Sequence, residues 1–149
     1  MSAPPDPALA GDERDALEKG VAEFNAGRYF ECHDTLEELW SGLRGPARDF
    51  FQGLIQVAVA QYHWSCDNHA GAESMMLRAL GRFQRYPDRY CGFDLGGQRA
   101  WLDRALERVR RREEFGTPPA WTFDGLAAAE DATRPGSGSD DARGGRRSP

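Results

Sequence analysis

Residues 50–64 read FFQGLIQVAVAQYHW, and this nearly continuous apolar run decides the fold. The run shows no alternation of apolar and polar residues, and it is apolar almost all round at helical spacing. The sequence therefore predicts a central, largely buried helix. Gln52, Gln56 and His63 interrupt the run and fall within roughly 40° of one another at about 100° per residue.

A second segment, residues 29–40 (YFECHDTLEELW), carries polar residues of the same kind. His33 and Glu37 are four residues apart, which is the spacing that lets two side chains on one helix meet. Buried polar groups are costly unless they are paired. The short connection between the two helices favours antiparallel packing, which would bring the two polar sets face to face. We therefore expect the five polar residues to be partners of one another or of a ligand; they are His33, Glu37, Gln52, Gln56 and His63.

The rest of the chain predicts an all-α fold, a compact bundle of about five helices built from helical hairpins. Asp12 is the expected cap of the first helix, and Gly27 suits a left-handed helix end. Mid-helix Gly53 predicts close approach of another backbone or of a ligand. Residues 91–97 are expected to form a connecting loop. The helices are expected over residues 12–26, 28–43, 46–65, 69–86 and 98–112.

The two ends of the chain differ in composition from this helical domain, which spans residues 12–115. Residues 1–11 are expected to form a flexible arm, and residues 116–149 an extended to disordered tail. Within that tail, Trp121 and Phe123 are expected to dock on the bundle. Residues 133–149 (TRPGSGSDDARGGRRSP) are of low complexity and are expected to be disordered.

Composition narrows the cellular setting. The three cysteines lack any Cys-x-x-Cys spacing, which argues against a disulfide framework and favours a reducing, cytoplasmic compartment. Cys32 is expected to behave as a small apolar residue. Neither a signal peptide nor an apolar run long enough to span a membrane is recognisable, so no membrane partner is expected. A homo-oligomer is compatible with the composition.

Charge is unevenly distributed, although the net value is only −5. Residues 1–40 carry ten acidic and three basic residues, whereas residues 78–112 carry ten arginines and four acidic residues. Either acidic and basic helices pack together, or the arginine-rich fourth and fifth helices bind nucleic acid or phosphate. Exposed aromatic residues between the arginines, expected of a nucleic-acid site, are not evident, so nucleic acid is the weaker interpretation.

Three interpretations of the His/Glu/Gln cluster stay open. It is a buried hydrogen-bond network that fixes helix register, a divalent metal site, or a pocket for a small molecule. In the metal site, His33, Glu37 and His63 would be the ligands. In the pocket, Trp40, Gln52, Gln56 and His63 would bind the ligand, and Glu37 and His33 would be the candidate acid–base catalytic pair.

The chain resembles one known family through its motifs. These motifs are Phe24-Asn-x-Gly-x-Tyr-Phe-Glu-x-His-Asp-x-Leu-Glu-x-x-Trp40, then Phe51-Gln-Gly-Leu-Ile-Gln-x-Ala58, His63 and Asn68-x-x-Gly-Ala72. They are similar to the family catalogued as domain of unknown function 309, over about residues 15–95. The resemblance implies an all-helical fold and no particular activity. The family's motif residues correspond here to Glu31, His33, Glu37, Trp40, Gln52, Gln56 and His63.

Taken together, the sequence favours a non-enzymatic binding or interaction module with its polar cluster between the second and third helices. The partner is an unidentified small molecule or protein. The alternative is a metal-dependent or acid–base enzyme, hydrolase-like, acting on a small substrate.

Overall fold

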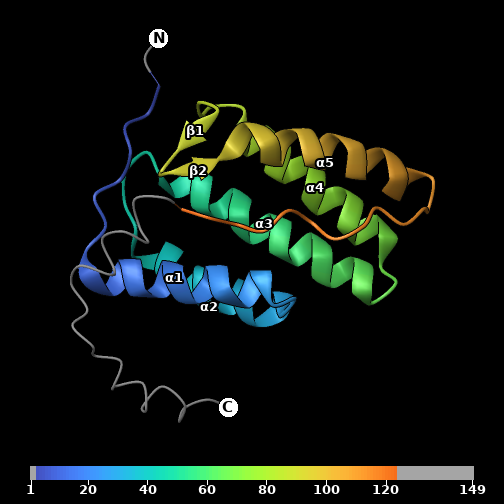
Figure 1. The fold of residues 1–149 in the computed structure, drawn as a ribbon, viewed down its shortest axis with the longest axis horizontal. Helices are drawn as coiled ribbons and strands as arrows, with labels where there is room; N and C mark the ends of the chain where they lie inside the picture. Colours follow the sequence, from blue (N-terminus) through green and yellow to red (C-terminus); the bar gives the residue numbers. More distant parts are fainter. Residues whose placement is uncertain (1–2, 124–149) are drawn as a thin grey trace.

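The structure, a computed structural model, describes residues 3–123, which form five helices and one short β-hairpin (Figure 1). This confirms the predicted all-α class. The elements are α1 (Gly11–Asn25), α2 (Tyr29–Gly42), α3 (Arg48–Ser65), α4 (His69–Phe83), β1 (Arg89–Tyr90), β2 (Phe93–Asp94) and α5 (Leu95–Arg110).

The helices pack in chain order. α1 packs on α2, α2 on α3, α3 on α4 and α4 on α5, and the contact between α3 and α4 is the most extensive. In Figure 1, α1 and α5 lie nearer the viewer, α2 and α4 lie behind them, and α3 passes through the centre. The predicted central helix is therefore α3, and ten of its residues are buried. None of the helices formed by residues 3–123 is long and apolar enough to cross a lipid bilayer.

Local signals set most helix ends. Gly27 adopts a φ of +80° after α1, as predicted, because glycine enters the left-handed region without strain. The Asn68 side chain accepts a hydrogen bond from the Gly71 N–H and caps α4. The expected Asp12 cap is wrong, because α1 already begins at Gly11. Glu13 reaches back instead, and its carboxylate accepts from the Ala10 N–H at 2.8 Å.

A β-hairpin replaces part of the loop expected over residues 91–97. Tyr90 pairs with Phe93 across a two-residue turn, Cys91 and Gly92, whose φ angles are +59° and +71°. Two successive positive φ angles are typical of the turn that suits the twist of a tight hairpin. α5 consequently begins at Leu95, three residues earlier than expected.

The N-terminal arm contacts this hairpin. The Tyr90 hydroxyl donates to the Pro5 carbonyl at 2.7 Å, and the Cys91 N–H donates to the Asp6 carboxylate at 2.8 Å. The segment expected to be a flexible arm is therefore tied to the bundle through residues 5 and 6.

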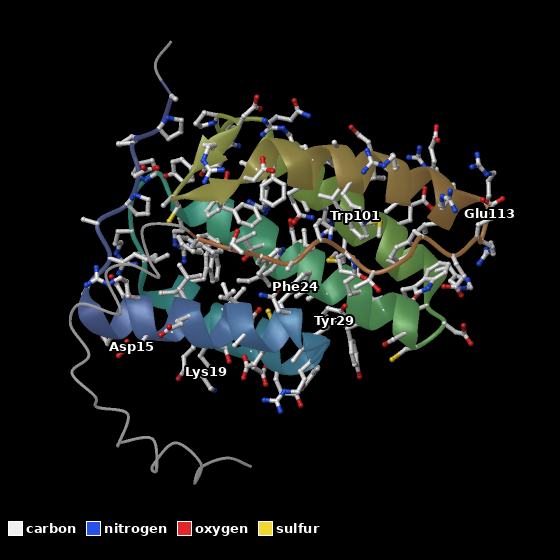
Figure 2. All side chains as sticks on the ribbon, in the orientation of Figure 1. Asp15, Lys19, Phe24, Tyr29, Trp101 and Glu113 are labelled. Carbon is white, nitrogen blue, oxygen red and sulfur yellow. The ribbon has the colours of Figure 1, made fainter. Side chains whose placement is uncertain are left out.

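Residues 117–123, which we call the strap, cross the bundle between α1 and α5 (Figure 1). Trp121 is 1% exposed and stacks on Phe24 of α1, with 3.7 Å between ring centroids. The Asn25 side chain also forms two hydrogen bonds with the Trp121 backbone. Figure 2 shows Phe24 and Trp101 on the two sides of the strap. The expected docking of Trp121 and Phe123 is confirmed, and residues 133–149 lie outside the described residues.

Gly53 allows α4 to pack closely on α3, and the group that approaches the glycine is a side chain of α4 rather than its backbone. A Cβ atom at this position would lie within about 3.0 Å of several ring carbons of Phe83, which is fully buried. The expectation that Gly53 faces another backbone or a ligand is therefore wrong. The phenyl ring from α4 occupies that space.

Candidate functional site on the face of helices 2, 3 and 4

The candidate site follows the one side of α3 that is not covered. α3 is buried along most of its length, but Gln52, Val59 and His63 are half-buried. With Gln56 they recur at spacings of four, three and four residues, so they share one side of the helix. This stripe supplies the middle of a surface to which α2 and α4 contribute the flanks.

α2 forms the first flank through two contacts with α3. Phe30 lies against Tyr62, with 5.3 Å between ring centroids, and the Arg48 guanidinium lies 3.9 Å above the Trp40 ring. Phe30 and Trp40 share a side of α2 with His33 and Glu37 because of the helical repeat.

α4 forms the second flank. The Arg82 side chain donates to the Gln56 carboxamide oxygen at 3.2 Å, and Gly71 packs against His63 and Asn68. Met75 and Arg78 lie between Gly71 and Arg82 on the same side of α4. We call the whole surface the three-helix face. Its residues are Phe30, His33, Glu37 and Trp40 of α2, Gln52, Gln56, Val59, Tyr62 and His63 of α3, and Gly71, Met75, Arg78 and Arg82 of α4.

The five polar residues predicted to form one cluster all lie on this face, but they are not partners of one another as a group. His33 contacts Glu37 at 3.5 Å and Asp34 at 3.5 Å. Gln56 pairs with Arg82, and His63 lies 3.2 Å from the Asn68 side-chain nitrogen. The alternative in which the five residues form a single network between α2 and α3 is wrong, because α4 and the adjoining turn supply the partners of Gln56 and His63.

The predicted metal ligands are likewise not assembled. Across residues 3–123, no three histidine, cysteine, aspartate or glutamate side chains gather as a group that could hold a metal ion. His33 and Glu37 are adjacent, but His63 pairs instead with Asn68, just beyond the C-terminal end of α3. The two remaining groups form a partly exposed imidazole–carboxylate pair, in which Glu37 can orient the His33 ring.

Two buried polar atoms on the three-helix face lack a partner. The Trp40 indole N–H and the Gln52 carboxamide oxygen are both shielded from solvent, and neither has a hydrogen-bond partner among the described residues. The Phe30–Tyr62 contact shows that they lie at one level. From Phe30 to Trp40 is ten residues forward on α2, and from Tyr62 to Gln52 is ten residues back on antiparallel α3. An unused donor of α2 and an unused acceptor of α3 therefore belong to neighbouring helices at a similar level of the bundle.

Cys32 is a core residue, as expected. It is fully buried, and burial, with a smaller contribution from the charge of Glu23, raises the pKa of its thiol to about 12. A thiol that stays protonated is a poor nucleophile. Cys32 is therefore excluded from the candidate catalytic groups.

The arginines of α4 and α5 are mostly paired. Arg82 and Arg85 both bind Asp49, and Arg110 binds Glu73 at 2.9 Å. Arg78 and Arg104 are the exceptions on these helices, since neither forms a hydrogen bond or an ion pair with the described residues. Asp49 and Glu73 belong to α3 and α4, so these arginines pair with neighbouring helices rather than with acidic α1.

Several residues of interest escaped the sequence analysis. Phe30 is 49% exposed, which helical periodicity alone did not indicate. Gln98 is 2% exposed and accepts a hydrogen bond from the Trp121 indole at 3.0 Å. The burial of Gln98 could have been predicted from the sequence. Gln98 precedes the apolar stripe of α5 by one helical turn, so it falls on the buried side of the helix.

The fold and the site thus define the class of protein, which is an all-helical domain with a polar three-helix face. Within it, residues 17–75 match the family described as Domain of unknown function (DUF309). This match confirms the resemblance indicated by the motifs, and it covers the C-terminal part of α1, all of α2 and α3, and the start of α4.

Two curated relatives are similar over parts of the chain. An uncharacterized protein of Aquifex aeolicus (strain VF5) is 29% identical over 119 residues, which are 78% of this chain and 34% of the relative. The uncharacterized protein YpuF of Bacillus subtilis (strain 168) is 44% identical over 62 residues, which are 40% of this chain and 36% of the relative. The matched region spans about a third of the length of both relatives.

Proposed function

We propose that the protein is a binding module whose three-helix face holds a segment of another polypeptide. The observation that carries the proposal is that the Trp40 N–H of α2 and the Gln52 carbonyl oxygen of α3 are both buried without a hydrogen-bond partner among the described residues. A buried polar group without a partner costs about 1–3 kcal/mol. A peptide chain offers both an acceptor C=O and a donor N–H, so it can satisfy both atoms once the side chains that cover them turn aside.

The length of the face favours a polypeptide over a small metabolite. The exposed aromatic pair, Phe30 and Tyr62, lies ten residues from Trp40 along α2, a distance of about 15 Å at 1.5 Å per residue. Exposed aromatic side chains supply apolar contact area for a partner. A bound segment that spans this distance would place its backbone on Trp40 and Gln52 and an apolar side chain on Phe30 and Tyr62.

The proposal predicts that peptides selected for binding depend on Trp40. A random peptide display library is panned on the protein, and affinities of the enriched peptides are measured by fluorescence anisotropy. Trp40→Phe keeps the aromatic ring but removes the N–H, and we expect it to weaken binding about tenfold because the peptide acceptor loses its donor. Phe30→Ala is expected to weaken binding as well.

Trp101→Phe is the matched control, because Trp101 lies on α5, away from the three-helix face. It is expected to leave peptide affinity unchanged. Enriched peptides that bind wild-type protein, Trp40→Phe and Phe30→Ala equally well would refute the proposal, as would a library that yields no specific binder.

A further inference from the structure

A second surface feature lies on the opposite side of the bundle, between α5 and the strap. It is a cavity of about 230 Å³. From α5 it is lined by Gly97, Gln98, Trp101 and Arg104, which recur along one side of the helix. From the strap it is lined by residues that include Thr122.

Gln98 lines this cavity and carries a buried hydrogen-bond donor. Its carboxamide oxygen accepts from the Trp121 indole N–H at 3.0 Å. An indole nitrogen can only donate, so this hydrogen bond fixes which end of the carboxamide is oxygen. The other end, the Gln98 NH₂ group, is buried without a partner among the described residues. A ligand that bonds to it would have to present an acceptor oxygen and displace the atoms that cover the NH₂ group.

Arg104 provides a positive charge at the edge of the cavity. It is exposed and forms no hydrogen bond or ion pair with the described residues, although it lines the cavity. Long helical side chains lean toward the helix N-terminus, so Arg104 leans toward Trp101 and Gln98. An unpaired guanidinium favours a carboxylate, which it can bind through two parallel N–H groups.

Trp101 and Asp94 restrict the ligand further. Trp101 lies between Gln98 and Arg104 in the sequence and is half-buried, so its ring offers a surface for a planar group. Asp94, which caps α5 by accepting from the Gly97 N–H at 3.0 Å, also lines the cavity. Its negative charge disfavours a second anionic group at that end.

We propose that this cavity binds a small organic monocarboxylate that carries a carbonyl oxygen and a planar apolar group. The carboxylate binds Arg104, the carbonyl accepts from the Gln98 NH₂ group, and the planar group lies against Trp101. Pockets for drug-sized ligands are about 300–1,000 Å³, so a cavity of about 230 Å³ suits a smaller molecule. The site shares no residue with the three-helix face.

The test uses hippurate (N-benzoylglycine), which combines a carboxylate, an amide carbonyl and a phenyl ring. The full chain has four tryptophans, whose indole N–H signals are separate reporters in ¹H–¹⁵N NMR spectra. We expect saturable shifts of the Trp101 and Trp121 indole signals and of the Gln98 side-chain signal. Arg104→Gln is expected to weaken hippurate binding about tenfold, through loss of a charge-assisted hydrogen bond.

Arg78→Gln is the matched control, because Arg78 is also exposed and unpaired among the described residues but lies on α4. It should leave hippurate affinity unchanged, and the uncharged methyl ester of hippurate should bind wild-type protein as weakly as hippurate binds Arg104→Gln. The proposal is overturned if hippurate causes no saturable shift of Trp101 and Trp121, or if Arg104→Gln binds it normally. Shifts confined to Trp40 would equally overturn it.

Discussion

At the scale of single residues, glycines decide how closely the central helices approach. Gly53 of α3 faces the buried ring of Phe83, whereas Gly81 of α4 has no atom within 4 Å of the position that a Cβ would occupy. Both glycines lie inside helices, where glycine is about 1 kcal/mol less favourable than alanine. The same substitution therefore has opposite consequences at the two positions.

Gly53→Ala is expected to lower the free energy of unfolding by up to about 2 kcal/mol, because overpacking a core costs about 1–3 kcal/mol and the gain in helix propensity offsets only part of it. Gly81→Ala is expected to raise it by about 0.5–1 kcal/mol. Urea titrations followed by circular dichroism measure both values. A stabilising Gly53→Ala substitution would show that Phe83 can move away, contrary to this account.

At the scale of elements, the strap joins the first and last helices. Trp121 stacks on Phe24 of α1 and donates through its indole to Gln98 of α5. Phe123 stacks on Phe93 at the end of the hairpin, with 4.8 Å between ring centroids. α1 and α5 lie at opposite ends of the order in which the helices pack, so the strap supplies a bridge between them.

Trp121→Ala is expected to destabilise the protein by about 3–5 kcal/mol, the usual cost of truncating a large buried aromatic residue. Thr122→Ala is the neighbouring control and should change stability by no more than about 0.5 kcal/mol, because Thr122 is exposed. The midpoints of urea unfolding give both values. Equal stabilities for the two variants would mean that the strap does not contribute to the fold.

At the scale of the whole molecule, burial of acidic side-chain groups links stability to alkaline pH. Burial raises the pKa of the Cys91 thiol to about 12, with a smaller contribution from the charge of Asp6. Burial likewise raises the pKa of the Cys32 thiol to about 12, and it raises the pKa of the Tyr90 hydroxyl. The unperturbed thiol pKa is 9.0. Above that pH the unfolded chain loses protons that the folded chain keeps, so unfolding becomes more favourable.

Stability is therefore expected to be complete below pH 9 and to fall as the pH rises toward about 12. Each thiol contributes a slope of about 1.4 kcal/mol per pH unit. Urea unfolding at several pH values between 8 and 11 measures the slope, and Cys32→Ala should reduce it whatever its effect on stability at neutral pH. An unchanged slope in that variant would contradict the assignment to Cys32.

Helical periodicity and local end signals determined much of this protein from the sequence alone. The apolar run of residues 50–64 specified a buried central helix, and Gly27 specified a left-handed helix end. Trp121 was recognisable as a docking residue, since a large aromatic in a polar tail needs apolar cover. The same periodicity placed His33 and Glu37 on one side of α2, and Gln52, Gln56 and His63 on one side of α3, because the direction of a side chain around a helix depends only on its position in the chain.

Only the tertiary structure decided which groups meet on that surface. Gln56 pairs with Arg82 of α4, twenty-six residues away, rather than with a residue of α2. Phe83 fills the space beside Gly53, and Gln98 meets Trp121 from a segment beyond the helices. Periodicity gives the direction in which a residue points, but not the register, the crossing angle or the neighbour that lies opposite. Those depend on how all the side chains at a contact fit together.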